Sequence, residues 1–229
     1  MPEFYEVQRM KHYLDDANIV NKKIVNATVP ILGARCFKTH SKIKAENFFL
    51  NNTLVSIQTV AKYTIFNFKK GAMLCHYRFT GVPHIVGKSY GNRLLSIHSL
   101  PLSHYSKQHV RFSLIFEDNT QLDYVDTRCL SHIHINEEDT SIAAFKEKLP
   151  CLEDLNNFKP CSYKAFKLQV SNSSQDIKTY LQNQKSAPSG IGNYLACEIC
   201  HQARLSPFKK IKSLSKKHYE LLIQAIQSI

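Results

Sequence analysis

The chain has 229 residues, and 43% of them are hydrophobic, so it can bury a sizeable core as one large domain or two small ones. The 30 Lys and Arg exceed the 18 Asp and Glu and give a net charge of +12, which favours nucleic acid as a partner. The 7 scattered Cys argue against a disulfide-rich secreted domain, and no apolar run approaches the roughly 18 residues that span a bilayer. Because the N-terminus also lacks a signal-peptide pattern, the sequence predicts an intracellular protein without a membrane anchor.

The first predicted element is a helix that starts directly after Pro2. Apolar residues recur at helical spacing along it, at Phe4, Val7, Met10 and Leu14. Proline suits the first helical turn because the backbone donor that it lacks would be unpaired there. Glu3 and Glu6 fall in the same turn, where carboxylates interact favourably with the helix dipole, so their position alone leaves a structural and a catalytic role open.

Residues 24–135 change to short β-branched and aromatic runs separated by turn residues. The clearest runs are residues 54–57, 63–68 and 110–116. Residues 69–71 and 117–120 contain the turn formers Gly, Asp and Asn and are predicted hairpin connections. We therefore predict that residues 1–135 form one domain, an N-terminal helix with a mostly antiparallel β-sandwich or barrel.

The composition becomes polar and acidic at residues 136–140, and we place a domain boundary there. Helical patterns follow at residues 177–184, 194–203 and 215–227. Residues 136–229 are therefore predicted to form an all-helical domain, which makes the whole chain an α+β protein.

Residues 189–195, Ser-Gly-Ile-Gly-Asn-Tyr-Leu, join two of these helical patterns through a glycine-bearing turn. Backbone N–H groups at such a helix start can bind a phosphate. The same residues fit a simple turn between helices, so both interpretations stay open at this point.

Six segments resemble motifs of the formamidopyrimidine-DNA glycosylase and endonuclease VIII family, and the N-terminal, strand-lysine and helix-two-turn-helix motifs among them follow the family's order along the chain. They are residues 2–7, 60–63, 74–81, 122–128, 180–199 and 203–207. The last two are similar to the helix-two-turn-helix signature of the family, and the six together extend over nearly the whole chain. The resemblance implies a bifunctional DNA glycosylase and abasic-site lyase, with a β-sandwich domain followed by a helix-two-turn-helix domain.

The resemblance assigns catalytic roles to four residues. The amine of Pro2, freed by removal of Met1, would attack C1′ of the damaged nucleotide and form an iminium. Glu3 would transfer protons during elimination, and Glu6 would support the first turn of the helix. Lys62, in a motif similar to the family's strand lysine, would bind a phosphate beside the extruded nucleotide, although on its own it also fits a solvated strand lysine.

The resemblance also implies a set of DNA-binding residues. They are His76, Arg78, Phe79, Arg128, Lys178, Gly192 and Asn193. Phe79 is the candidate wedge that fills the gap left by a flipped base, although an aromatic residue in a strand-rich region is more often part of the core. Cys129 and Leu130, which follow Arg128, depart from the Arg-Phe pair of the formamidopyrimidine branch. Oxidised pyrimidines are therefore slightly favoured over 8-oxoguanine and formamidopyrimidine as substrates.

Cys197 and Cys200 form a Cys-x-x-Cys pair, and His132 and His134 share one side of a predicted strand. Neither pair has a partner motif that would complete a metal site, so we predict no metal and no cofactor. Many family members continue into a zinc-finger hairpin with four Cys, and this sequence ends before any such element. We therefore expect a short member that favours single-stranded or opened DNA.

The sequence thus predicts a monomeric base-excision repair enzyme that acts on DNA with oxidised bases or abasic sites. Two alternatives are a non-catalytic protein that binds damaged or abasic DNA and a basic nucleic-acid-binding domain unrelated to repair. The presence of Pro2, Glu3 and Lys62 argues against the first alternative. The order of the family motifs along the chain argues against the second.

Overall fold

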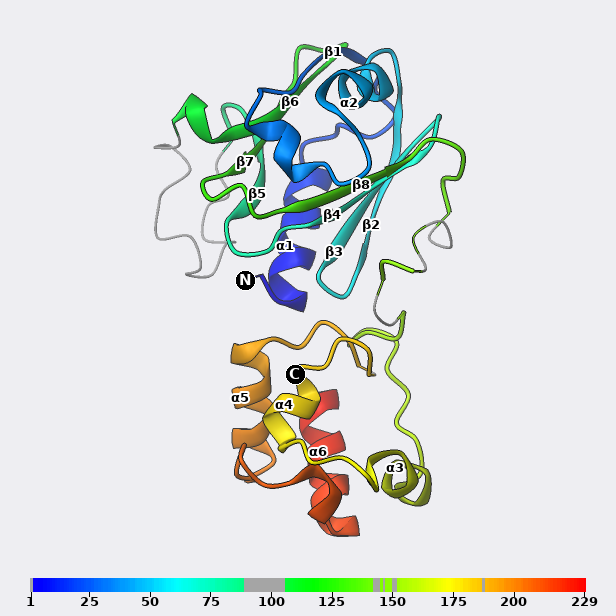
Figure 1. The fold of residues 1–229 in the computed structure, drawn as a ribbon, viewed down its shortest axis with the longest axis vertical. Helices are drawn as coiled ribbons and strands as arrows, with labels where there is room; N and C mark the ends of the chain where they lie inside the picture. Colours follow the sequence, from blue (N-terminus) through cyan, green and yellow to red (C-terminus); the bar gives the residue numbers. More distant parts are fainter. Residues whose placement is uncertain (1, 89–105, 142–144, 146, 150–151, 187) are drawn as a thin grey trace. The chain divides into compact units, whose positions relative to one another are not determined.

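The protein is described from a computed structural model of residues 1–229 (Figure 1). The description is confined to residues 2–88, 106–141, 145, 147–149, 152–186 and 188–229. The chain divides into two compact units, Met1–Lys146 and Glu147–Ile229. The last strand of unit 1 ends at Asn136. The polar residues 136–140, where the sequence predicted the domain boundary, belong to unit 1, because this unit extends to Lys146.

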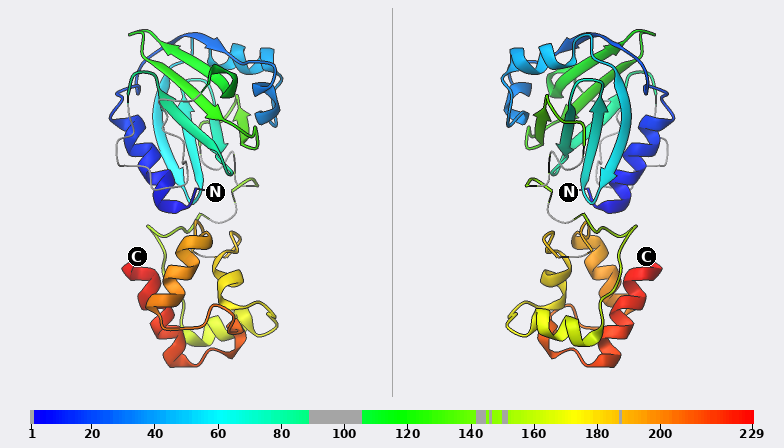
Figure 2. Two further views of the ribbon diagram at one scale, coloured as in Figure 1. Left: turned by 90° about the vertical axis from the view of Figure 1, so that its left-hand side faces the viewer. Right: turned by 90° about the vertical axis from the view of Figure 1, so that its right-hand side faces the viewer.

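Unit 1 begins with α1, Phe4–Asp15, which confirms the helix expected after Pro2. Its apolar positions are buried, and Val7 and Leu14 are fully excluded from solvent. The helix packs against β2 and β3 of one sheet and β5 of the other, so it runs along the sandwich with its buried stripe inward (Figure 2).

Two four-stranded antiparallel sheets form the body of unit 1, as the period-two patterns predict. The first sheet has the order β1-β6-β7-β5, made of Ile24–Thr28, Val110–Phe116, Gln121–Asp126 and Gly81–Ile85. The second has the order β2-β3-β4-β8, made of Leu54–Val60, Tyr63–Phe68, Ala72–His76 and His132–Asn136. The predicted hairpin connections at residues 69–71 and 117–120 join β3 to β4 and β6 to β7.

Aromatic side chains fill the core between the sheets. The rings of Phe112 and Tyr124 stack with centroids 5.1 Å apart, and Phe49 stacks on Phe112 at 5.6 Å. Phe49 ends α2, Lys42–Phe49, a helix that the sequence did not predict because it lies within the strand-rich region. The Ser41 side chain accepts a hydrogen bond from the Lys44 N–H and so caps this helix.

Unit 2 is helical, as predicted, and contains α3, α4, α5 and α6 (Figure 1). Their bounds are Tyr163–Val170, Ile177–Leu181, Asn193–Gln202 and Lys216–Ser228. The sequence did not predict α3, and α4 ends at Leu181, three residues before the end of the expected helical pattern. No helix in the described part of the chain is long and apolar enough to cross a membrane.

Candidate functional site

The N-terminal turn of α1 places Pro2, Glu3 and Glu6 together. Pro2 is buried, and Glu3 is in extended conformation as the residue that precedes the helix. The Glu6 carboxylate accepts a hydrogen bond of 2.8 Å from the Glu3 N–H, while the Glu3 carbonyl accepts from the N–H groups of Glu6 and Val7. Burial raises the pKa of Glu6. Glu6 therefore holds the backbone of Glu3 on the first turn of α1, and Pro2 directly precedes Glu3 in the chain.

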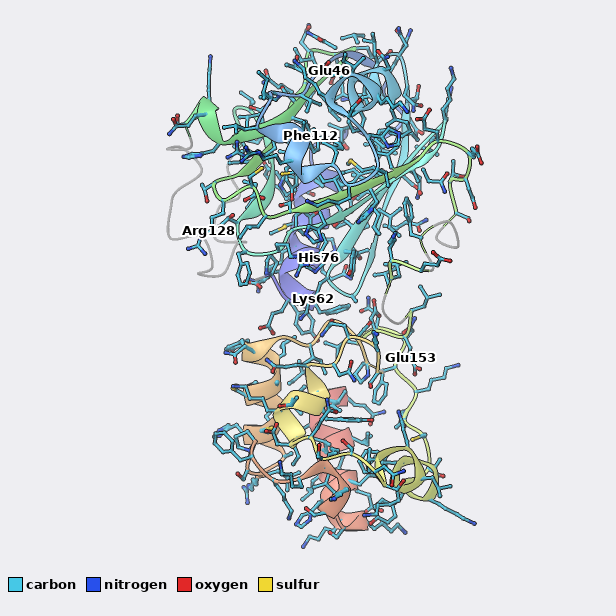
Figure 3. The ribbon with its side chains drawn as sticks, viewed as in Figure 1. Glu46, Lys62, His76, Phe112, Arg128 and Glu153 are labelled. Atoms are coloured by element: carbon cyan, nitrogen blue, oxygen red, sulfur yellow. The ribbon has the colours of Figure 1, made fainter. Side chains whose placement is uncertain are left out.

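Lys62 lies in the two-residue turn between β2 and β3, and not within a strand as the sequence suggested. The turn was missed because Ala61, which takes a left-handed φ of 53°, carries none of the usual turn signals. Although it lies at a hairpin tip, Lys62 is only 3% exposed. Burial lowers its pKa to about 8, and the negative charge of Glu3 opposes this shift. The turn thus holds a buried lysine that is mostly protonated at pH 7 and interacts electrostatically with Glu3; Figure 3 labels Lys62.

His76 ends β4 next to this lysine. Burial lowers its pKa to about 3, and the charges of Arg78 and Lys62 add to the shift, so the imidazole is neutral at physiological pH. Its Nδ1 accepts the Arg78 N–H at 3.3 Å, which places the ring proton on Nε2. The ring of Tyr63 lies 4.6 Å from the imidazole, centroid to centroid, across the β3–β4 register pair. The arrangement offers a neutral donor within a basic cluster, suited to an anionic group.

Asp126 is a fully buried carboxylate that joins two turns of unit 1. It accepts hydrogen bonds from the side chain of Thr80 and from the N–H groups of Arg128 and Cys129, both at 3.1 Å. Its second oxygen accepts from the N–H and the hydroxyl of Ser131, at 2.8 and 2.7 Å. The sequence assigned no role to Asp126. The only local signal was an acidic residue at the start of a turn, a position that Asp favours.

We expect Asp126→Asn to lower the free energy of unfolding by about 3 kcal/mol, because an amide presents a donor where the carboxylate accepts only. Urea unfolding measures the change through the midpoint and the slope. Asp118→Asn is the matched control, since Asp118 is exposed and pairs with Lys22 on the surface, where the loss should stay below about 1 kcal/mol. Equal losses in the two variants would contradict the role given to Asp126.

The two turns joined by Asp126 carry the predicted wedge, Phe79, and two predicted DNA arginines, Arg78 and Arg128. Phe79 is 49% exposed, which a core residue would not be, and its neighbour Arg78 takes a left-handed φ of 53°. Arg128 is exposed, and its N–H also donates to the Thr80 hydroxyl at 3.3 Å. An apolar side chain and a guanidinium are therefore presented from one hydrogen-bonded unit.

Unit 2 holds the predicted glycine turn at the start of α5. Gly190 takes a left-handed φ of 99°, and its N–H donates to the side-chain oxygen of Gln184 at 3.0 Å. The amide nitrogen of Gln184 donates to the Ile191 carbonyl at 2.8 Å, so one glutamine braces the turn from both sides. Gly192 precedes the helix and is buried, whereas Asn193, its first residue, is exposed. The positive end of the α5 dipole is thus presented by a fixed turn.

The remaining sequence candidates in unit 2 lie on two helices. Lys178 is half-buried on α4, which packs against α5. On α5, Cys197 is exposed and Cys200 is buried, and both are free thiols. Among the described residues, no group of three or more His, Cys, Asp and Glu is placed to hold a metal ion.

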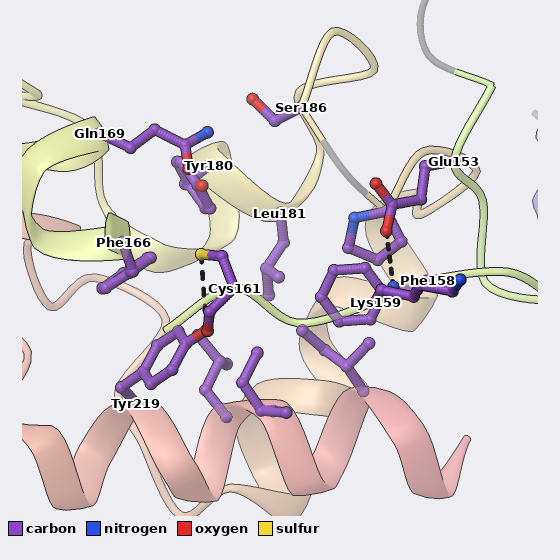
Figure 4. A pocket seen from close by; sticks show the side chains of 14 residues that line it. Glu153, Phe158, Lys159, Cys161, Phe166, Gln169, Tyr180, Leu181, Ser186 and Tyr219 are labelled. Atoms are coloured by element: carbon purple, nitrogen blue, oxygen red, sulfur yellow. Dashed lines mark hydrogen bonds between the residues drawn. The ribbon is translucent and has the colours of Figure 1, made fainter. Parts of the chain in front are cut away.

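A cavity of about 270 Å³ lies inside unit 2, between α6 and the segments that cover it (Figure 4). Its lining is mainly aromatic and aliphatic, with Phe166, Leu181 and Leu222 among the contributors. The Tyr219 hydroxyl donates to the Cys161 carbonyl at 2.5 Å on one side of it. Glu153 and Lys159 also line the cavity, and the Glu153 carboxylate accepts a hydrogen bond of 2.6 Å from the Lys159 N–H. None of the residues that the sequence singled out as catalytic or DNA-binding lines it.

A family model described as the formamidopyrimidine-DNA glycosylase N-terminal domain matches residues 1–133 of the chain. The chain belongs to the formamidopyrimidine-DNA glycosylase family. The match covers the N-terminal turn, the Lys62 hairpin and both turns joined by Asp126, so the candidate site residues of unit 1 lie in the matched part.

Full-length formamidopyrimidine-DNA glycosylases match along the whole chain. The protein from Ureaplasma parvum is 30% identical over an alignment of 232 positions that covers all of this chain and 77% of that protein. The protein from Mycoplasma pneumoniae is 27% identical over 226 residues, which are 98% of this chain and 74% of that protein. The chain therefore spans about three quarters of the length of these formamidopyrimidine-DNA glycosylases.

Solved structures of the formamidopyrimidine-DNA glycosylase family have the same fold. A structure of MutM in complex with carbocyclic 8-oxo-G containing DNA has a TM-score of 0.78 at 22% identity and covers 99% of this chain and 77% of its own. The Lactococcus lactis enzyme with an abasic site containing DNA has a TM-score of 0.77 at 22% identity, with the same coverage. These likenesses confirm the predicted order of N-terminal helix, antiparallel sandwich and helical unit.

Proposed function

We propose that this protein is a DNA glycosylase and abasic-site lyase that removes oxidised bases, with Pro2 as its nucleophile. The observation that carries the proposal is the electrostatic interaction of the buried Lys62 with Glu3, the residue that follows Pro2 and precedes α1. A buried charge lowers the stability of a fold through desolvation, and groups with a perturbed pKa cluster at functional sites. Relatives named formamidopyrimidine-DNA glycosylase along the whole chain support the same function.

The proposed reaction starts once Met1 has been removed, because the Pro2 nitrogen is an amide until then. The free amine attacks C1′ of the damaged nucleotide, the C1′–N bond forms, and the bond to the base breaks. Glu3 protonates the ring oxygen as the sugar opens, which leaves an iminium between C1′ and the Pro2 nitrogen. The iminium makes the C2′ hydrogen acidic, the Glu3 carboxylate left by the first transfer takes that proton, and the C3′–O bond breaks as the 3′ phosphate leaves. Glu6 supports the reaction indirectly, since it holds the backbone of Glu3.

The proposed DNA contacts come from both units. In unit 1, Lys62 and the neutral His76 donate hydrogen bonds to phosphates, and Arg78 adds positive charge. Phe79 fills the gap left by the flipped base, and Arg128 contacts the opposite side of the gap. In unit 2, Asn193, the backbone at Gly192 and the nearby Lys178 bind a further phosphate at the head of α5. Each proposed side-chain contact can be tested by a single substitution of its residue.

Borohydride trapping tests the central step. The processed protein is incubated with an abasic-site oligonucleotide and borohydride, which reduces an iminium to a permanent protein–DNA adduct. We expect an adduct that maps to Pro2 by peptide mass, and no adduct from a sample that retains Met1, because an amide nitrogen cannot form an iminium. Intact mass of the N-terminus must accompany each sample. Processed protein that binds the DNA but gives no adduct would support the alternative of a non-catalytic damage-binding protein.

A panel of lesions addresses the substrate. Oligonucleotides with an oxidised pyrimidine, with 8-oxoguanine and with a formamidopyrimidine are compared in single-stranded and duplex form. Cys129 and Leu130 after Arg128 favour the pyrimidine, whereas the names of the relatives favour the formamidopyrimidine. The ranking of kcat/KM across the panel decides between them.

A further inference from the structure

Two cysteines lie against each other beside the Arg128 turn. The Sγ atoms of Cys36 and Cys129 are 3.4 Å apart, although 93 positions separate them in the chain. A disulfide places its sulfurs about 2.05 Å apart, so the two atoms are within a small side-chain rotation of bonding distance. Both thiols are free in this structure.

The two thiols differ in their surroundings. Cys36 is fully buried, and burial raises the pKa of its thiol above the usual range. The hydrogen bond with Cys129 raises this pKa further. Cys129 is half-buried, and its Sγ donates a hydrogen bond of 3.1 Å to the Leu32 carbonyl. A dissolved oxidant therefore meets Cys129 first and finds Cys36 directly behind it.

The anchors of the two thiols also differ. Cys36 ends the 3₁₀ helix Gly33–Cys36, which is pressed onto β6 so closely that a Cβ at Gly33 would fall 1.8 Å from the Arg111 carbonyl oxygen. Cys129 takes a left-handed φ of 54° in the turn that also contains the exposed Arg128. A bond between the sulfurs would connect a turn on the surface to a fixed part of the core.

We propose that Cys36 and Cys129 form a reversible disulfide when the protein meets a hydroperoxide, and that this bond fixes the turn carrying Arg128. The Cys129 sulfur attacks the peroxide, the O–O bond breaks, and a sulfenic acid forms with loss of water or alcohol. The Cys36 sulfur then attacks the Cys129 sulfur, and the S–O bond breaks. The hydroxyl of the Cys129 sulfenic acid leaves as water with the proton of the Cys36 thiol. The two sulfurs supply the two electrons that reduce the peroxide, and an external dithiol reverses the reaction.

Peptide mass spectrometry tests the bond itself and needs no DNA. After treatment with hydrogen peroxide, trypsin should release residues 36–38 linked to residues 129–146, and dithiothreitol should separate them. The linked pair should be absent from Cys36→Ala and Cys129→Ser and present in Cys197→Ser, which removes an exposed thiol elsewhere. The oxidised form should melt on the order of 5 °C higher, since the bond closes a long loop. Oxidation of Cys129 to sulfinic acid with no linked peptide would overturn the proposal.

A second measurement addresses the Arg128 turn and rests on the proposed function. The bond ties the turn that carries Arg128 to the 3₁₀ helix Gly33–Cys36, so Arg128 can adjust less to bound DNA, and we expect oxidation to weaken binding of an abasic-site duplex by about fivefold or more. Dithiothreitol should restore the affinity, and Cys129→Ser should show no change on oxidation. Unchanged affinity of the linked protein would refute the effect on the turn. Failure of the reduced protein to bind any DNA would instead count against the proposed function, and the linked peptide would still report on the bond.

Discussion

Replacing Glu3 by Gln should slow cleavage of an abasic-site oligonucleotide by about 10² to 10⁴-fold, the range typical of a lost general acid or base. Gln has nearly the same volume and keeps an oxygen acceptor, but it cannot carry the proton from the opening sugar. The Glu6 carboxylate still accepts from the backbone N–H of residue 3, so the turn should keep its shape. Single-turnover cleavage on processed protein measures the rate, and binding to a non-cleavable abasic analogue should change only a few-fold.

Glu46→Gln is the matched control for this variant. The Glu46 carboxylate also accepts a backbone N–H, that of Val29 at 2.8 Å, but it lies at the opposite end of unit 1 from Lys62 (Figure 3). We expect Glu46→Gln to cleave at the rate of the unchanged protein. A wild-type rate in Glu3→Gln would mean that another group transfers the proton, and an equal loss in both variants would indicate a general effect on the fold.

The N-terminal turn could be predicted because its signals are local. The helical spacing of apolar residues and the proline before them predict α1, whereas the roles of Glu3 and Glu6 were assigned by the family resemblance and not by their positions. The period-two runs likewise predicted β2, β3 and β6. These features depend on residues within a few positions of each other, which a sequence displays directly.

The features that were missed depend on contacts between distant residues. Asp126 joins Thr80 to the Arg128 turn across 46 positions, and no local pattern indicates that bond. The burial of Lys62 at a hairpin tip depends on how α1 and the sheets pack around it, and the turn itself uses an alanine at positive φ. Propensity also failed at α2, where Phe48 and Phe49 resemble strand residues but end a helix that packs on β1.

Replacing Lys62 by Met should make the protein more stable and a weaker DNA binder. Burial lowers the pKa of Lys62 from 10.5 to about 8, so the folded state holds its proton less tightly than the unfolded chain does. Folding therefore carries a penalty of up to about 3 kcal/mol below pH 8, and Met of similar length avoids it. We expect the free energy of unfolding at pH 7 to rise by about 1 to 3 kcal/mol in urea.

The pH dependence of this gain distinguishes desolvation from better packing. Above about pH 8 the folded protein holds the neutral amine, and neutralising the unfolded lysine costs less as the pH approaches 10.5, so the advantage of Lys62→Met should shrink by more than half between pH 7 and pH 9.5. Affinity for an abasic-site duplex should fall about 10 to 100-fold at pH 7, the value of a buried charge-assisted hydrogen bond to phosphate. Lys70→Met, at an exposed lysine in the β3–β4 turn, should change neither quantity measurably. A Lys62→Met protein that is less stable at pH 7 would show that the buried ammonium stabilises the fold. Unchanged DNA affinity would show that Lys62 does not contact the DNA.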